Sequence, residues 1–323
     1  MTRGLFRRSG ATALVLITLA LLACEHIPTE PEVVSKEELS QVPFERLSGK
    51  ILFRRTLHDR PGEYYLMLLE AASRQLKVVA YFGSFVPANF ALSHDANRAV
   101  FSYFIYASTF WGYNWQLYVM DLATTSWRRL CPSEYDDSFP AWSPDDSHIA
   151  FWTNRDLRSS IWLADLATDS ASHVVNVSDS IHTRVAWLGD GNAFVYVTVD
   201  TAHHAGLYRF DLRNRASTLL YSLEVPVSQA IIKHPALSPD ETRVAFVRAQ
   251  VSGIDEIWVF DLATAVASRL TTGVSDWHPA WSADGTQILF GRGDHLVIMR
   301  SDGSELAQVT FGKHTNEYPS WVP

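Results

Sequence analysis

Residues 138–168 read SFPAWSPDDSHIAFWTNRDLRSSIWLADLAT, and most of the chain repeats this stretch. The pattern predicts a strand, a turn and three further strands at 141–142, 143–146, 148–152, 161–165 and 173–177. Short runs of β-branched and aromatic residues between turn formers are typical of strands. Pro144 and Asp145 favour the turn, because Pro fixes its own φ and Asp bonds the backbone two residues on. One such sheet cannot bury both of its faces, so it needs stacked copies.

The first 23 residues have the composition of a bacterial export signal. Arg3, Arg7 and Arg8 form a basic head, and the apolar run ATALVLITLALLA follows at 11–23. This run is short for a bilayer-spanning helix but suits a secretory signal peptide. It ends Leu-Leu-Ala-Cys, which resembles the lipobox of bacterial lipoproteins, so we expect Cys24 to become the acylated first residue. The alternative is an ordinary signal peptide whose cysteine is incidental.

The segment after Cys24 and the charge of the chain indicate its surroundings. Residues 24–48 are polar and contain prolines, as expected of a tether between a lipid and a folded domain. The formal charge is −8, and removal of residues 1–23, with three arginines and no acid, makes it −11. An acidic exported chain without a basic run is a poor nucleic-acid binder. We therefore expect contact with a membrane through the lipid, and no nucleic acid.

Copies of the motif Ala-Trp-Ser-Pro-Asp recur at intervals of 40 to 50 residues. The six copies begin at Ala91, Ala141, Ala186, Ala236, Ala280 and Ser320. A second and a third strand are predicted after each of the first five copies. The third strand carries Asp in register in four of them, at Asp121, Asp165, Asp211 and Asp261. We expect this Asp to close the turn into the fourth strand through a local side-chain hydrogen bond.

The two ends of the repeat region are incomplete in complementary ways. Upstream, three strands without a first strand are predicted at 50–53, 64–69 and 75–81. The last copy, 318–322, is a first strand followed by the end of the chain. Joining the two predicts an all-β fold over 49–323: a six-bladed β-propeller of four-stranded antiparallel blades, closed by the C-terminal strand. In a rival register, residues 43–53 provide the missing first strand and turn.

Trp-Ser-Pro-Asp, then Ile-Ala-Phe, then an Ile-Trp-x-x-Asp-Leu strand resembles the WD40-like repeat of TolB-like β-propellers. The resemblance covers residues 49–323. It implies a periplasm-facing protein of the cell envelope that binds a protein or peptide. TolB has an additional α/β domain before its propeller, and residues 25–48 are too short to form one. The chain therefore resembles a stand-alone propeller, and the partner binding of TolB does not transfer whole. Glu25 after the lipidated cysteine favours the outer membrane under the enterobacterial sorting rule.

The repeats also predict a site at the mouth of the central channel. In an antiparallel blade, the start of the first strand and the second-to-third loop lie at the same end. The residues just before the six first strands are Asn89, Phe139, Arg184, His234, His278 and Tyr318. Such a mixture of aromatic, cationic and imidazole groups suits a ligand or peptide site. The alternative is that these side chains simply fill the hole present in every propeller.

The connection YFIYASTFWGYNW at 103–115 is the most unusual stretch of the repeat region. Phe110, Trp111 and Tyr113 surround Gly112 at an expected loop tip on the channel-mouth face. Exposed aromatic side chains at such a tip would stack on a sugar or grip a partner chain. The alternative is a long hairpin whose aromatic rings pack on a neighbouring blade.

A second function is suggested by the histidines. His234 and His278 lie on adjacent blades, and three more histidines could approach them from the same face: His182, His203 and His204. A polysaccharide lyase family with a related propeller binds a metal through channel histidines, which makes a metal-dependent carbohydrate-active enzyme the alternative function. No HxH or HxxxH spacing recurs, and no GxSxG or Gly-rich phosphate loop is present. We therefore predict no catalytic residue, no metal and no cofactor, and carbohydrate stays open as a ligand.

Overall fold

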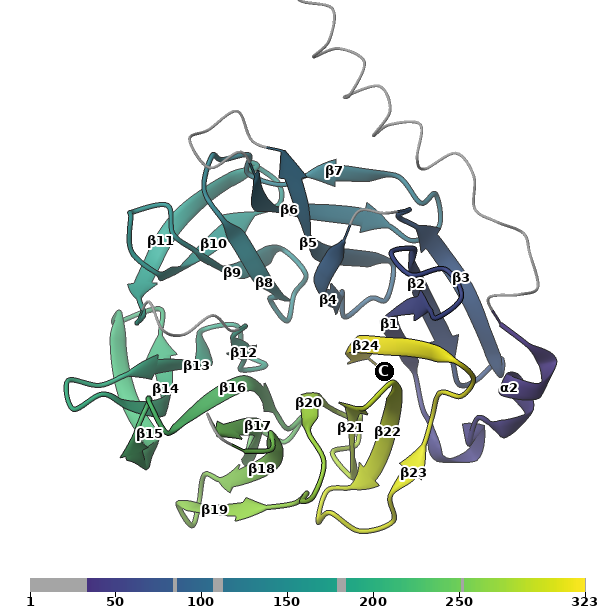
Figure 1. Ribbon diagram of the computed structural model, residues 1–323. Coiled ribbons are helices and arrows are strands. Elements are labelled where there is room, and N and C mark those ends of the chain that lie inside the picture. Colours follow the sequence, from purple (N-terminus) through teal and green to yellow (C-terminus); the bar gives the residue numbers. More distant parts are fainter. Residues whose placement is uncertain (1–33, 84–85, 107–112, 179–183, 251–252, 323) are drawn as a thin grey trace, which may run out of the picture.

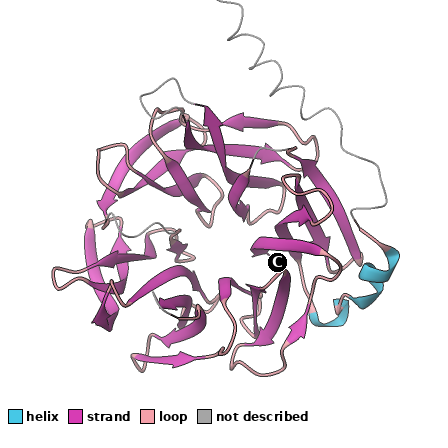
Figure 2. Ribbon diagram, viewed as in Figure 1, coloured by secondary structure: helices cyan, strands magenta, loops and turns pink. Residues whose placement is uncertain are grey.

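The computed structural model describes residues 34–83, 86–106, 113–178, 184–250 and 253–322. Six four-stranded antiparallel sheets lie around one central axis, with their first strands innermost (Figure 1). Figure 2 shows strands throughout the ring and helix confined to one segment outside blade 1. The predicted six-bladed propeller is confirmed.

The blades are numbered in chain order, and each is given from its innermost to its outermost strand. Blade 1 consists of β24 (His314–Val322), β1 (Lys50–Leu57), β2 (Tyr64–Glu70) and β3 (Gln75–Tyr81). Blade 2 consists of β4 (Pro87–Leu92), β5 (Arg98–Tyr106), β6 (Tyr113–Asp121) and β7 (Trp127–Arg129). Blade 3 consists of β8 (Asp137–Trp142), β9 (His148–Thr153), β10 (Ser160–Asp165) and β11 (Ser170–Asn176).

The second half of the ring follows the same order. Blade 4 consists of β12 (Ala186–Trp187), β13 (Ala193–Val199), β14 (His204–Asp211) and β15 (Ala216–Pro226). Blade 5 consists of β16 (Ala230–Leu237), β17 (Arg243–Gln250), β18 (Glu256–Asp261) and β19 (Val266–Arg269). Blade 6 consists of β20 (Asp276–Trp281), β21 (Gln287–Arg292), β22 (His295–Arg300) and β23 (Ala307–Gln308).

The C-terminal strand closes the ring. β24 pairs antiparallel with β1, from Lys50 opposite Val322 to Leu57 opposite His314. The rival register at 43–53 is wrong, because Phe44–Arg46 forms the 3-10 helix η1 and β1 begins only at Lys50. Closure through β24 leaves no open edge on the inner side of blade 1.

Two recurrent side-chain devices form the turns. In blade 3, Ser143 Oγ donates to Asp145 Oδ1 at 2.6 Å and accepts from the His148 amide at 2.9 Å. The Ser147 amide donates to Asp145 Oδ1 at 3.2 Å, which is the bond expected two residues on. The Asp at the end of the third strand also acts as predicted. Asp165 Oδ1 accepts from the two backbone amides of the next turn, at 2.8 and 2.9 Å, and the same pattern occurs at Asp121, Asp211 and Asp261.

The hydrophobic core lies between neighbouring blades rather than in a single centre. Six buried clusters each combine side chains from two adjacent blades. Tryptophans of the repeat motif connect the blades by donating their indole N–H to a carbonyl of the preceding inner strand. The bonds are Trp142 to Ala91 at 3.0 Å, Trp187 to Ala141 at 3.3 Å and Trp281 to Ala236 at 3.0 Å. The fixed order of blades therefore determines where each inner-strand side chain lies.

The end of the segment expected to be a tether is folded onto the propeller. Helix α2 (Lys36–Gln41) is capped by Ser35 Oγ, which accepts from the Glu38 amide at 2.9 Å. Val42, Phe44 and Leu47 enter the core shared by blades 6 and 1. The polar composition concealed this packing, because three well-spaced apolar residues are enough to bury one side of a short segment. Residues 24–33 lie outside the described residues.

No helix in the described part of the chain is long and apolar enough to cross a membrane.

Candidate functional site

Five of the six predicted channel-mouth residues share an uncommon backbone conformation. Their φ angles lie between 51° and 55°, and the five residues are Asn89, Phe139, His234, His278 and Tyr318. A residue other than glycine adopts this left-handed region rarely, at a cost of about 1–3 kcal/mol that the surrounding structure must offset. The pairing of the first and second strands shifts register at the same place in blades 1, 2, 3, 5 and 6. In these five blades the inner strand therefore bulges at its channel residue.

The bulges bring side chains of different blades into contact. The ring centroids of His234 and His278 are 4.1 Å apart, and those of His278 and Tyr318 are 4.6 Å apart. Phe139 lies 6.2 Å from His234 at one end, and the Arg54 guanidinium lies 4.8 Å above Tyr318 at the other. These five side chains, from blades 3, 5, 6 and 1, form a continuous series that we call the channel arc.

The remaining two predicted residues make polar contacts between blades. Asn89 Nδ2 donates to Ser138 Oγ at 3.1 Å. An Arg184 NH2 group donates to the carbonyl of Phe90 at 3.1 Å. Arg184 precedes β12 of blade 4 and Phe90 belongs to β4 of blade 2, so this bond reaches past the blade between them. All six predicted residues thus lie on the inner side of the ring.

Two cationic side chains, one within the channel arc and one beside it, were missed by the sequence analysis. Arg54 of β1 pairs with Glu317 and donates to the Pro87 carbonyl at 2.9 Å. Lys233, which precedes His234, lies 3.7 Å from the Asp255 carboxylate. Arg54 belongs to the second strand of its blade, and an alignment of first strands therefore could not find it.

Burial and positive charge keep the two channel histidines neutral. Burial, and to a smaller extent the positive charges of Arg184 and Lys233, lower the pKa of His234 to about 3. The pKa of His278 is well below its usual value, first through burial and then through His234, Arg184, Arg54 and Lys233. The Nδ1 atom of His278 is buried and has no hydrogen-bond partner in the described part of the chain. Burial also lowers the pKa of Arg184, to about 10, which leaves it charged at neutral pH.

A cavity of about 400 Å³ lies along the inner strands, from Arg184 to the turns after them. Its walls include Pro235, Pro279 and Pro319, each of which follows a member of the channel arc. Of the six predicted residues Arg184 alone lines this cavity. The cavity therefore involves a different part of the inner strands from the channel arc.

The other predicted site residues are only partly described. Cys24, Phe110 and Trp111 lie outside the described residues, as does His182. Tyr113 begins β6, where its backbone lies opposite Tyr106. Close to this end of the β5–β6 hairpin, Phe104 is 38% exposed and its ring lies 5.1 Å from Trp115. An aromatic pair is therefore present on this hairpin apart from the predicted tip.

Within the described ranges, no three His, Cys, Asp or Glu side chains are grouped so that they could hold a metal ion. The lyase-type alternative thus rests on the sequence resemblance.

Comparisons with known proteins show the fold. No family model and no curated protein sequence matches the chain. The structure of TolB from Acinetobacter baumannii is 22% identical, covers 85% of this chain and 67% of its own, and has a TM-score of 0.71. A protein provisionally named TolB from Agrobacterium tumefaciens is 16% identical, covers 86% of this chain and all of its own, and has a TM-score of 0.62. The nidogen–laminin complex contains a propeller that is 8% identical, covers 84% of this chain and 98% of its own, and has a TM-score of 0.62. The chain therefore has the propeller fold found in TolB structures.

Proposed function

We propose that this protein is a cell-envelope binding module that holds a protein or peptide partner at the channel mouth. The strained inner-strand bulge carries the proposal, since five blades hold a non-glycine residue with positive φ at the same place. Filling the channel would not require strain at every one of these positions, because ordinary strands also direct alternate side chains inward. Backbone strain maintained in this way is typical of functional sites.

The chemistry of the channel arc indicates what it would bind. Neutral imidazole and aromatic rings offer a partly apolar surface, and Arg54 and Arg184 add positive charge. His278 Nδ1 offers a hydrogen-bonding position that is buried and unpartnered in the described part of the chain. An extended peptide with an apolar side chain and a hydrogen-bond donor suits this surface. Anchoring at Cys24, which belongs to the same proposal, would keep the propeller beside envelope proteins.

The test is crosslinking and co-purification from the native envelope with the full-length acylated chain as bait. A partner should be captured by the wild type and lost at least in part with His278→Ala and Phe139→Ala. It should be retained by His173→Ala, which changes a histidine on the outer strand β11. Cys24→Ser, which cannot be acylated, should release the chain from membranes. Capture that is equal in all variants with unchanged melting temperatures would disprove the channel-mouth site.

A further inference from the structure

Two junctions between blades are covered by an arginine from the preceding blade. Arg98, the first residue of β5, lies 4.7 Å above the ring of Trp142 and donates to the Asp146 carbonyl at 3.2 Å. At the junction of blades 5 and 6 the corresponding residues are Arg243, Trp281 and Gly285, with distances of 4.7 and 3.1 Å. Trp142 and Trp281 are only 3% and 6% exposed. We call this arrangement the arginine clasp.

The junction of blades 3 and 4 has the tryptophan but lacks the arginine. His148 occupies the clasp position in the strand register. Its backbone lies opposite Asp165, just as the backbone of Arg98 lies opposite Asp121 and that of Arg243 opposite Asp261. Its shorter side chain contacts its own blade instead. Nδ1 lies 2.6 Å from Ser147 Oγ, and Nε2 lies 3.7 Å from the Asp165 carboxylate.

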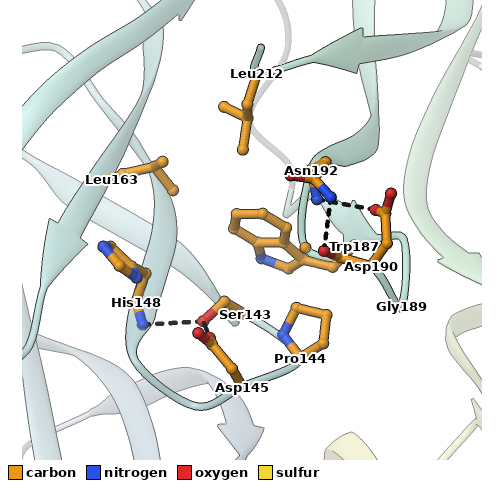
Figure 3. Close-up of a pocket in the computed structure, with 11 residues that line it drawn as sticks. Ser143, Pro144, Asp145, His148, Leu163, Trp187, Gly189, Asp190, Asn192 and Leu212 are labelled. Atoms are coloured by element: carbon orange, nitrogen blue, oxygen red, sulfur yellow. Dashed lines mark hydrogen bonds between the residues drawn. The ribbon is translucent and has the colours of Figure 1, made fainter.

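A pocket of about 490 Å³ opens where the arginine would lie. Figure 3 shows the indole of Trp187 among His148, Leu163 and Leu212, with Ser143, Asp145 and Asp190 at the rim. The indole is partly exposed. Its orientation is fixed, because its N–H bonds the Ala141 carbonyl and its ring meets Phe194 edge-on at 5.6 Å.

The other requirements of a guanidinium are also met in the pocket. Gly191 takes the place of Asp146 and Gly285, whose carbonyls accept from the clasp arginines. The carboxylates of Asp145 and Asp190 line the pocket, and hydrogen bonds from neighbouring turn residues hold both pKa values below their usual range. An aromatic face, a carbonyl acceptor and nearby negative charge favour a planar cation.

We propose that this pocket binds a guanidinium group, presented as an arginine side chain of a partner polypeptide. The ligand would take the position that Arg98 takes between blades 2 and 3 and that Arg243 takes between blades 5 and 6. An arginine within a polypeptide suits the site better than free arginine, whose carboxylate would add a negative charge beside Asp145 and Asp190. The pocket lies by the turns after the inner strands, at the opposite end from the channel mouth, so the inference is independent of the proposed function.

The test uses the full-length chain labelled with 5-fluorotryptophan and observed by ¹⁹F NMR. The Trp187 signal is identified by its loss in Trp187→Phe. Titration with Nα-acetyl-arginine N-methylamide should shift this signal. The matched lysine derivative should bind at least about tenfold more weakly, as measured from the same shift. His148→Arg should restore the clasp, weaken binding of the arginine derivative by at least about tenfold and raise the melting temperature by about 2 °C.

A reciprocal variant tests the same idea at another junction. Arg243→His should lower the melting temperature and make the Trp281 signal respond to the arginine derivative. The proposal is overturned if the Trp187 signal does not respond, if its response survives in His148→Arg, or if the lysine derivative acts equally well. Tighter binding of free arginine than of the blocked derivative would overturn the assignment to a polypeptide.

Discussion

The two channel histidines should make stability fall in mild acid. Their folded-state pKa values lie below the unfolded value of about 6.5, that of His234 at about 3. Between these values the unfolded chain binds protons that the folded chain excludes, so the free energy of unfolding decreases as the pH falls. Above pH 6.5 the two histidines do not lower the free energy of unfolding, and below it they lower this free energy progressively. For His234 we expect a loss on the order of 1 kcal/mol by pH 5, a figure that allows for solvent screening of a partly exposed side chain. His278 should add a loss of the same sign.

Denaturant titrations at pH 7.5 and pH 5 measure this effect. The double variant His234→Gln, His278→Gln should lose clearly less stability between the two pH values than the wild type. His203→Gln, which changes an exposed histidine of the β13–β14 turn, should behave like the wild type. Equal pH dependence in the wild type and the double variant would show that the histidines are not kept neutral by the fold.

The sequence located the channel residues but not their geometry. Aligning the repeats placed all six at one level of the ring, because each inner strand starts in the same way. The left-handed bulge could not be foreseen, since a residue before proline normally adopts an extended conformation. The proline after Phe139, His234, His278 and Tyr318 therefore pointed away from the bulge. The contact between the two histidines depends on how neighbouring blades are set, which spacing does not determine.

At the scale of elements, helix α2 is attached to blade 1 by a buried ion pair. Glu38 and Arg55 are 2% and 0% exposed, and the guanidinium bonds both carboxylate oxygens. Arg55 Nε also donates to Asn316 Oδ1 at 2.9 Å, on the closing strand β24. Removing the carboxylate alone would leave a buried, uncompensated charge.

Glu38→Ala should therefore destabilise the protein by about 3–5 kcal/mol. Glu37→Ala, on the exposed side of the same helix, should change the unfolding free energy by no more than about 0.5 kcal/mol. Chemical denaturation of the two variants beside the wild type measures both values. Near-equal effects would mean that α2 is not held to the blade through Glu38.

The strands could be predicted from the sequence, whereas the packing of the N-terminal segment could not. The third and fourth strands of blade 3, expected at 161–165 and 173–177, are found at Ser160–Asp165 and Ser170–Asn176. These strands could be assigned because several copies of the repeat show the same pattern. Residues 34–48 occur once, and their packing rests on long-range contacts such as Glu38 with Arg55. No local pattern records such contacts.

At the scale of the whole molecule, stability depends on closing the ring. β24 supplies the inner strand of blade 1 and contacts the inner strands of its neighbours on both sides. Trp321 is 8% exposed, and its indole N–H donates to the Ser48 carbonyl at 2.6 Å, whereas the other motif tryptophans bond the preceding blade. The last strand therefore also holds the chain where it enters the first blade.

Truncation after Gly312 should leave the propeller open and unstable. The deletion removes the whole of β24, exposes the edge of β1 and leaves Arg55 without Asn316. The loss of buried Trp321 alone is worth about 3–5 kcal/mol, a large share of a domain's total of about 5–15 kcal/mol. An unpaired inner edge also invites pairing between chains, so the truncated protein should aggregate.

The single variant Trp321→Ala, which keeps the strand, should stay monomeric but melt at a lower temperature. Thermal melts and light scattering of both variants distinguish loss of the strand from loss of one side chain. Wild-type-like melting of the truncated chain would mean that the blades hold together without closure, contrary to the pairing of β24 with β1.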